Sequence, residues 1–194
     1  MKIIISILAI IAVLTGGYFI FKLNNSGGNM AEAKNSKVLV AYFSATGTTR
    51  SVAENLAQAT DADIYEIKPL KPYSKADLDW TNKNSRTSVE MSNHSSRPEM
   101  VKDDFSVEPY DIVYLGFPIW WYIAPTIINT FLEKHDFSNK TIVLFATSGG
   151  SGFGKTIDNL KPSVSSSARI IQGEVLNSNP SVDKLRQWVK SLKL

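Results

Sequence analysis

Five short apolar, β-prone segments constrain the fold of this chain more than any other feature of its sequence. They lie at about residues 37–43, 63–67, 111–116, 141–147 and 169–176. All but the last are nearly continuous apolar runs or have strong β character, as expected for strands that helices cover on both faces. Helix-like segments separate them. The alternation predicts an α/β fold of three layers, with a doubly wound, five-stranded parallel sheet at its centre.

Three of the connecting segments have the periodicity of helices that pack on a sheet. The first spans residues 50–60, the second has Pro125 in its first turn, and the last follows Ser181. Their apolar stripes are Val52, Ala53, Leu56 and Ala57; Ile127, Ile128, Phe131 and Leu132; and Val182, Leu185, Trp188, Val189 and Leu192. Segment 72–108, by contrast, is long and polar, which is typical of a functional or partly helical insertion. We expect a short helix over residues 77–91.

The N-terminal part of the chain does not have the pattern of a globular domain. Residues 3–21 are almost entirely apolar and are flanked by Lys2 and Lys22. At about 1.5 Å per residue, a helix of this length nearly crosses a hydrocarbon core of about 30 Å. The apolar run is long for a cleaved signal peptide, and this favours a retained anchor. We therefore divide the chain into a signal-anchor segment (1–22), a flexible linker (23–36) and a folded domain (37–194).

Two locations stay open on the sequence alone. The anchor would attach the protein to a membrane, with the domain on the extracytoplasmic side as one alternative, because the flanking lysines show no usable asymmetry. If Met30 is the true start, the protein would be cytoplasmic.

Charge and composition exclude several functions. Only Lys2, Lys22, Lys34 and Glu32 precede residue 37, so the domain holds 18 of the 21 basic and 17 of the 18 acidic residues. A nearly neutral domain with dispersed charges has no basic stripe for nucleic acid. The absence of cysteine excludes disulfides, thiol redox chemistry and iron–sulfur clusters. The two histidines lie in unrelated contexts, so we expect both to be solvated and predict no metal site.

Three loops are predicted to follow strands at the carboxyl edge of the sheet, where ligands of open parallel sheets bind. They span residues 44–49, 116–122 and 146–152. The first reads Ser-Ala-Thr-Gly-Thr-Thr and directly precedes a helix. Its hydroxyls can donate hydrogen bonds, its glycine lets backbone N–H groups approach, and the helix N-terminus adds partial positive charge. The loop therefore predicts a phosphate site built from neutral donors.

The other two loops suit a flat ring. Trp120, Trp121 and Tyr122 in the second loop would expose apolar surface that is unfavourable unless something covers it. A planar aromatic ligand would stack on them, and we expect one of the two indoles to be buried under segment 72–108. The third loop has small residues whose free backbone N–H groups suit the polar edge of a ring. Phosphate seat, aromatic wall and ring edge together predict a flavin mononucleotide (FMN) site.

From about Lys37 to its C-terminus, the chain resembles the flavodoxin-like family, in particular a bacterial branch with a Gly-Phe-Pro-Ile-Trp-Trp second loop. The resemblance rests on residues 44–49, 116–121, 128–133 and 147–152. It implies the strand order 2-1-3-4-5 and non-covalent FMN, with no catalytic side chain. It also implies that the phosphate is held by Ser44, Thr46, Gly47, Thr48 and Thr49, and that the isoalloxazine is lined by Pro118, Ile119, Trp120, Trp121, Thr147, Ser148, Gly149 and Gly150. Typical flavodoxins are acidic and soluble, so the neutral charge and the predicted anchor are departures.

The resemblance implies a monomeric electron carrier that serves redox partner proteins or small electron acceptors. The alternative is an FMN-dependent reductase of quinones or related electrophiles that uses NAD(P)H. The absence of a visible second dinucleotide site favours the carrier. A third alternative is a binding module without flavin.

A rival motif lies in the third loop. Residues 149–156 match the nucleoside-triphosphate pattern G-x-x-x-x-G-K-[ST] and follow an apolar strand. However, no later strand ends in an aspartate that could bind Mg²⁺, and only 38 residues follow Thr156. The flavin interpretation uses the same loop and explains the other two loops as well.

Overall fold

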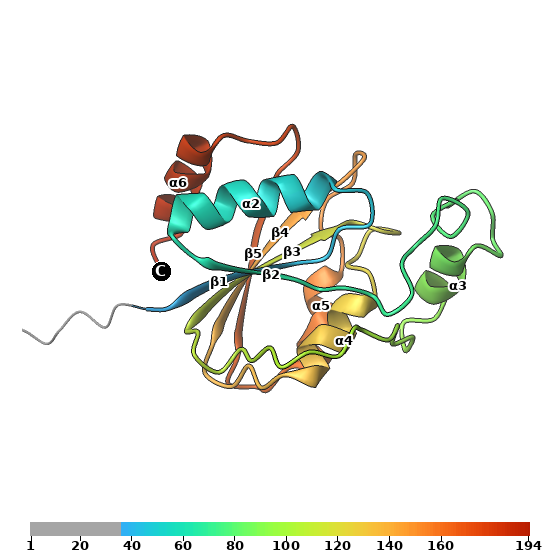
Figure 1. The fold of residues 1–194 in the computed structure, drawn as a ribbon, viewed down its shortest axis with the longest axis horizontal. Coiled ribbons are helices and arrows are strands. Elements are labelled where there is room, and N and C mark those ends of the chain that lie inside the picture. Colours follow the sequence, from blue (N-terminus) through green and yellow to red (C-terminus); the bar gives the residue numbers. More distant parts are fainter. Residues whose placement is uncertain (1–35) are drawn as a thin grey trace, which may run out of the picture. The chain divides into compact units, whose positions relative to one another are not determined.

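A five-stranded parallel sheet between two layers of helices forms the centre of the computed structural model, which describes residues 36–194 (Figure 1). The strands are β1 (Val38–Tyr42), β2 (Asp63–Glu66), β3 (Ile112–Pro118), β4 (Thr141–Thr147) and β5 (Arg169–Val175). Their order is β2-β1-β3-β4-β5 and every neighbouring pair is parallel. The predicted doubly wound sheet and its strand order are confirmed.

The helices cover both faces of the sheet. Helices α2 (Thr48–Thr60) and α6 (Val182–Ser191) pack together on one face, whereas α4 (Ile127–Lys134) and α5 (Thr156–Leu160), followed by the 3₁₀ turn η1 (Lys161–Ser163), cover the other (Figure 1). Helix α3 (Arg86–Ser92) stands apart from these layers, beyond one end of the sheet (Figure 1).

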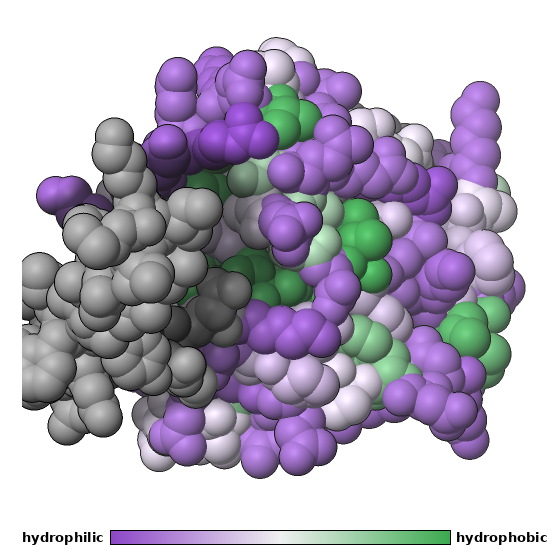
Figure 2. Space-filling model, turned by 60° about the vertical axis from the view of Figure 1, so that its left-hand side comes forward, coloured by the Kyte–Doolittle hydropathy of each residue, from purple (hydrophilic) through white to green (hydrophobic). Residues whose placement is uncertain are grey.

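The strand period of two divides the core between the two faces. Along β1, Leu39 and Ala41 join the core under α4 and α5, while Val40 and Tyr42 join the core under α2 and α6. Most residues of the predicted helix stripes are buried in these two cores. Hydrophilic residues make up most of the coloured part of the face shown in Figure 2, with hydrophobic residues among them.

Segment 72–108 differs from its prediction. A helix was expected over residues 77–91, but α3 begins only at Arg86. Side chains before it accept hydrogen bonds from nearby backbone N–H groups: Asp77 from Ser74 (2.8 Å), Asp79 from Thr81 (3.1 Å) and Asn82 from Asn84 (2.9 Å). Such local bonds compete with the helical ladder and favour turns. The first half of the predicted helix is therefore wrong.

The predicted signal-anchor segment and all of the predicted linker except Ser36 lie outside the described residues. Among residues 36–194, no helix has both the length and the apolar character needed to cross a bilayer.

His135 follows α4 and is not the solvated residue that was expected. Its ring lies against Phe105 and Phe131, with ring centroids 5.6 and 5.0 Å away. Its Nε2 atom is buried and has no hydrogen-bond partner within the described part of the chain. Burial, and secondarily the charge of Lys134, lowers the pKa of this imidazole.

We expect the folded protein to lose stability between pH 7.5 and 5.5 through His135. In the unfolded chain, the pKa of an imidazole is about 6.5. In the folded protein, the pKa of His135 is lower. The stability that neutral His135 contributes is therefore complete above the unfolded pKa and is lost as the pH falls below it. Urea denaturation at the two pH values measures this loss. His135→Phe should reduce the loss and His94→Gln should preserve it; equal losses in both variants would contradict the assignment.

Candidate functional site

A cleft of about 980 Å³ opens at the carboxyl edge of the sheet. Its walls come from the loops after β1, β3 and β4, from Asn177 after β5, and from segment 72–108. Twelve of the thirteen predicted site residues line it: Ser44, Thr46, Thr48, Thr49, Pro118, Ile119, Trp120, Trp121, Thr147, Ser148, Gly149 and Gly150. The thirteenth, Gly47, lies in the loop between Thr46 and Thr48. The structure thus brings the predicted residues together, while their role in binding stays a prediction.

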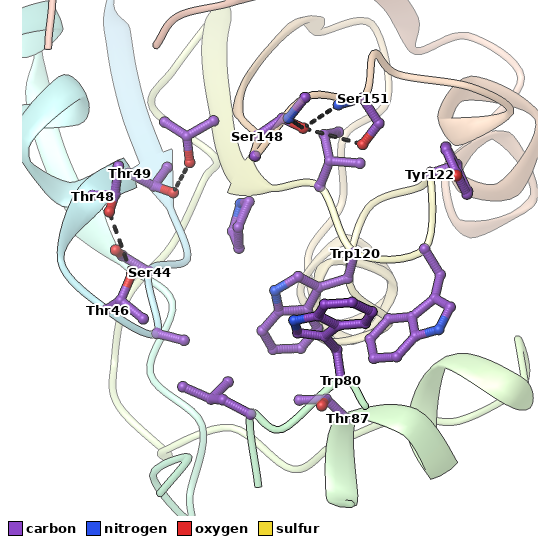
Figure 3. A pocket seen from close by; sticks show the side chains of 18 of the residues that line it. Ser44, Thr46, Thr48, Thr49, Trp80, Thr87, Trp120, Tyr122, Ser148 and Ser151 are labelled. Carbon is purple, nitrogen blue, oxygen red and sulfur yellow. Dashed lines mark hydrogen bonds between the residues drawn. The ribbon is translucent and has the colours of Figure 1, made fainter. Parts of the chain in front are cut away.

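One end of the cleft is rich in hydroxyl groups (Figure 3). The Thr46 and Thr48 hydroxyl oxygens lie 3.4 Å apart, and Ser44 Oγ accepts a hydrogen bond from the Gly47 N–H at 3.1 Å. The Ser44 hydroxyl hydrogen therefore stays available for a ligand. Helix α2 begins at this loop, and its N-cap, Gly47, has no side chain to cap the first N–H groups. This end offers several neutral donors and a helix dipole to an anion.

Gly47 has a φ of 93°, which L side chains rarely adopt, so glycine suits this turn. A Cβ atom built there would meet no atom within 4 Å. The glycine therefore leaves open space in the loop as well as permitting its backbone conformation.

Thr49 and Thr147 connect the first and third loops. Their hydroxyl oxygens lie 2.8 Å apart, and both residues are buried although they line the cleft. The sequence assigned Thr49 to the phosphate and Thr147 to the ring; the structure places the two in direct contact.

The other end of the cleft is aromatic (Figure 3). The partly buried Trp120 contacts Phe43 and Tyr73 edge to face, with centroids 5.5 and 5.3 Å away. Tyr73 belongs to segment 72–108, so Trp120 is the indole that this segment partly covers. Trp121, in contrast, is 42% exposed and Tyr122 is 70% exposed.

Trp121 and Tyr122 occupy the tip of a tight turn. Reciprocal backbone hydrogen bonds between Trp120 and Ile123, at 3.0 and 3.1 Å, close it. The φ angles of Trp121 and Tyr122 are 47° and 68°, as in a type I′ turn, where Asn and Gly are the usual residues. Bulky residues in this region each cost about 1–3 kcal/mol. The surrounding structure therefore has to stabilise a turn that presents two aromatic side chains.

The third loop corrects one expectation. Its backbone N–H groups were expected to be free, but those of Gly150 and Ser151 donate to Ser148 Oγ at 3.2 and 2.9 Å. A Cβ atom built at Gly149 or at Gly150 would meet nothing within 4 Å, and both glycines line the cleft. This loop is therefore open to the cleft at both glycines.

Several residues of the cleft were not identified from sequence. Leu78 and Thr87 reach it from segment 72–108, and Asn177, whose Oδ1 accepts from the Ser148 N–H at 2.9 Å, reaches it from the loop after β5. The position of Asn177 just beyond a strand was an available signal.

Of Trp80, Arg86 and Arg97 in segment 72–108, only Trp80 lines the cleft. Arg86 bonds to Glu90 at 2.7 Å, and Arg97 forms two bonds to Glu133 at 2.7 and 2.8 Å.

The nucleoside-triphosphate motif does not form its site. The Thr156 side chain, which would have to reach Mg²⁺, is fully buried and donates to the Phe153 carbonyl at 2.6 Å. The glycines of the motif instead contribute to the cleft through Gly149 and Gly150.

The residues present fit a ligand with a phosphate at one end and a flat ring at the other. Hydroxyl donors and a helix N-terminus form one end, and indoles form the other. Gly47 and Gly149 leave open space where a side chain would otherwise begin. A doubly wound sheet with such a cleft at its carboxyl edge is typical of α/β proteins of the flavodoxin type.

Comparison with known proteins agrees with a fold of the flavodoxin type. The family model described as flavodoxin matches residues 37–192, so the chain belongs to the flavodoxin family. A candidate flavoprotein from Bacteroides eggerthii is 46% identical, with a TM-score of 0.76, over 82% of this chain and 99% of that one. One from Bacteroides uniformis is 48% identical, with a TM-score of 0.74, over 81% and 99%.

A more distant structure shares the fold. It is a flavoprotein from Lactobacillus acidophilus in complex with FMN, 22% identical, with a TM-score of 0.57, over 77% of this chain and 98% of that one. None of the curated proteins compared with the chain matches it.

Proposed function

We propose that this protein binds FMN in the cleft and transfers electrons through it to redox partner proteins or small acceptors. The observation that carries the proposal is a hydroxyl-rich end and an aromatic end within one cleft of about 980 Å³ (Figure 3). The FMN complex of the Lactobacillus acidophilus flavoprotein supports the choice of ligand.

Different residues of the cleft bind the phosphate and the ring of FMN. Ser44, Thr46 and Thr48 donate to the phosphate together with the first N–H groups of α2, and Trp120 and Trp121 flank the ring. FMN, when bound, supplies electron-transfer chemistry that the side chains lack. Burial of the ring against indoles disfavours its reduced anion, because charge is unfavourable in an apolar site.

Purified protein should contain FMN, or take it up, in a one-to-one ratio. Absorption spectroscopy, followed by identification of the released flavin, measures this. If the purified protein is colourless and does not bind added FMN, the result would favour a binding module without flavin.

Thr46→Ala is expected to weaken FMN binding by about 1 kcal/mol or more, because it removes a phosphate donor. It should leave riboflavin binding unchanged, since riboflavin has no phosphate. Quenching of flavin fluorescence by the apoprotein gives both dissociation constants. Equal weakening for both flavins would mean that the loop does not hold the phosphate.

The uncharged lining of the cleft supports the carrier over the NAD(P)H-dependent reductase. Dinucleotides carry a pyrophosphate. The hydroxyl-rich end of the cleft is assigned to the FMN phosphate, and none of the lining residues, all of which are described, has a positive side chain to pair with a further anion. We expect NADH and NADPH to leave bound FMN oxidised under anaerobic conditions. Steady turnover of NADPH with a quinone would favour the reductase.

We also propose that residues 1–22 attach the protein to a membrane, on the strength of the apolar run at 3–21. Cell fractionation with protease accessibility tests the attachment and the side. Full recovery in the soluble fraction, with Met30 as the first residue, would contradict it.

A further inference from the structure

We propose that the cleft contains a second subsite, for an uncharged planar aromatic electron acceptor such as a quinone. Trp80 of segment 72–108 would form one wall, and Trp121 and Tyr122 at the tip of the tight turn would form the other. The inference rests on the proposed function, because the acceptor would receive its electrons from FMN.

The cleft has both the room and the surface for a second ligand. Its volume of about 980 Å³ lies near the upper end of the range of about 300–1,000 Å³ for small-molecule sites. Trp80, Tyr122 and Trp121 keep 74%, 70% and 42% of their surface exposed. Three large aromatic side chains on one cleft form an apolar area of the kind that marks ligand sites. Of these three side chains, only Trp121 was assigned above to the flavin ring, so Trp80 and Tyr122 remain for a second ligand.

The wall formed by segment 72–108 is held in place by a cluster at its base. Arg86 stacks on the Tyr73 ring at 3.9 Å and bonds to Glu90 at 2.7 Å, and Tyr73 donates to Glu90 at 2.6 Å. Tyr73 in turn contacts Trp120. The segment that carries Trp80 is thus anchored to the aromatic end of the cleft.

The opposite wall is also fixed. The turn is closed by the bonds between Trp120 and Ile123, and it packs on Gly154, where a Cβ atom would lie 2.3 Å from the Tyr122 carbonyl oxygen. Two anchored walls favour a flat guest that stacks between or upon aromatic faces.

The absence of charge in the lining favours an uncharged planar ligand over an anionic one. No residue lining the cleft, all of them within the described part, is acidic or basic, and the nearby Arg86 is paired with Glu90. An anionic guest would lose hydration without gaining an ion pair, whereas a neutral ring loses little. The acceptor would accept two electrons from reduced FMN with one proton, take a second proton from solvent, and become a hydroquinone. A low-potential donor, dithionite in the test below, re-reduces the flavin.

The test uses full-length protein loaded with FMN. After anaerobic reduction by dithionite, stopped-flow absorption follows flavin reoxidation by menadione, an uncharged naphthoquinone, and by a sulfonated naphthoquinone. We expect saturation with menadione and at least tenfold lower kcat/KM for the sulfonated compound. Trp80→Ala should lower kcat/KM for menadione about tenfold. Isothermal titration of menadione into the oxidised holoprotein should show binding that Trp80→Ala weakens.

Val89→Ala is the matched control, because Val89 is an exposed apolar residue of α3 that does not line the cleft. It should leave both readouts unchanged, and both variants should keep the wild-type affinity for FMN. If the wild type takes up no FMN, the proposed function fails and the subsite with it. If it holds FMN but menadione neither saturates nor depends on Trp80, only the subsite is wrong.

Discussion

Gly149→Val is expected to weaken FMN binding about 100-fold while leaving the fold intact. Gly149 lines the cleft, and a Cβ atom built on it enters space with no atom within 4 Å. The valine side chain would therefore occupy the space that we assign to the isoalloxazine ring of FMN. Overpacking of a site costs up to about 3 kcal/mol, which is about 100-fold in affinity. Titration of the apoprotein with FMN, followed by flavin fluorescence, measures the change.

Gly152→Val is the control for this substitution. Gly152 also has open space around its Cβ position and a φ outside the left-handed region, but it does not line the cleft. Both variants should melt near the wild-type temperature without FMN, and Gly152→Val should keep the wild-type dissociation constant. Equal effects of the two valines would place the ring away from Gly149.

Glu90→Ala is expected to destabilise the protein by about 3 kcal/mol. Glu90 accepts from Arg86 and from the Tyr73 hydroxyl, and the Arg86 and Glu90 side chains are only 19% and 13% exposed. Removal of one partner leaves the other charge buried and unpaired, which costs about 3–5 kcal/mol in buried pairs. Burial and the Glu90 bond already raise the pKa of Tyr73, so that hydroxyl stays protonated and also loses its acceptor. Urea denaturation gives the change in unfolding free energy.

The same substitution should make segment 72–108 more sensitive to proteolysis than the sheet. Asp183→Ala is a control, because its ion pair with Arg186 is exposed, at 85% and 46%, and exposed pairs contribute about 1 kcal/mol or less. A loss in Glu90→Ala no larger than that in Asp183→Ala would show that the cluster does not anchor the segment.

The sequence was sufficient to predict the sheet and most of the cleft because both depend on local patterns. Nearly continuous apolar segments predict strands of a buried parallel sheet. The loops that follow such strands all lie at the carboxyl edge of the sheet. Predictions failed where side chains compete for the backbone. Asp77 and Asp79 favoured turns over a helix, and Ser148 occupied N–H groups that were expected to be free.

Segment 72–108 marks the limit of prediction from this sequence. Nothing in its composition placed Leu78 and Thr87 in the cleft, because their positions depend on tertiary contacts through Tyr73 and Glu90.

The contact between Thr49 and Thr147 makes the direction of one hydrogen bond depend on what the cleft contains. Each hydroxyl has a single hydrogen, and either oxygen can be the donor across the 2.8 Å separation. When Thr147 donates, the Thr49 hydrogen is free for an anion beside α2; when Thr49 donates, the Thr147 hydrogen turns to the third loop. A ligand in one half of the cleft therefore determines whether the threonine facing the other half offers a hydrogen-bond donor or only an acceptor, without any movement of the backbone.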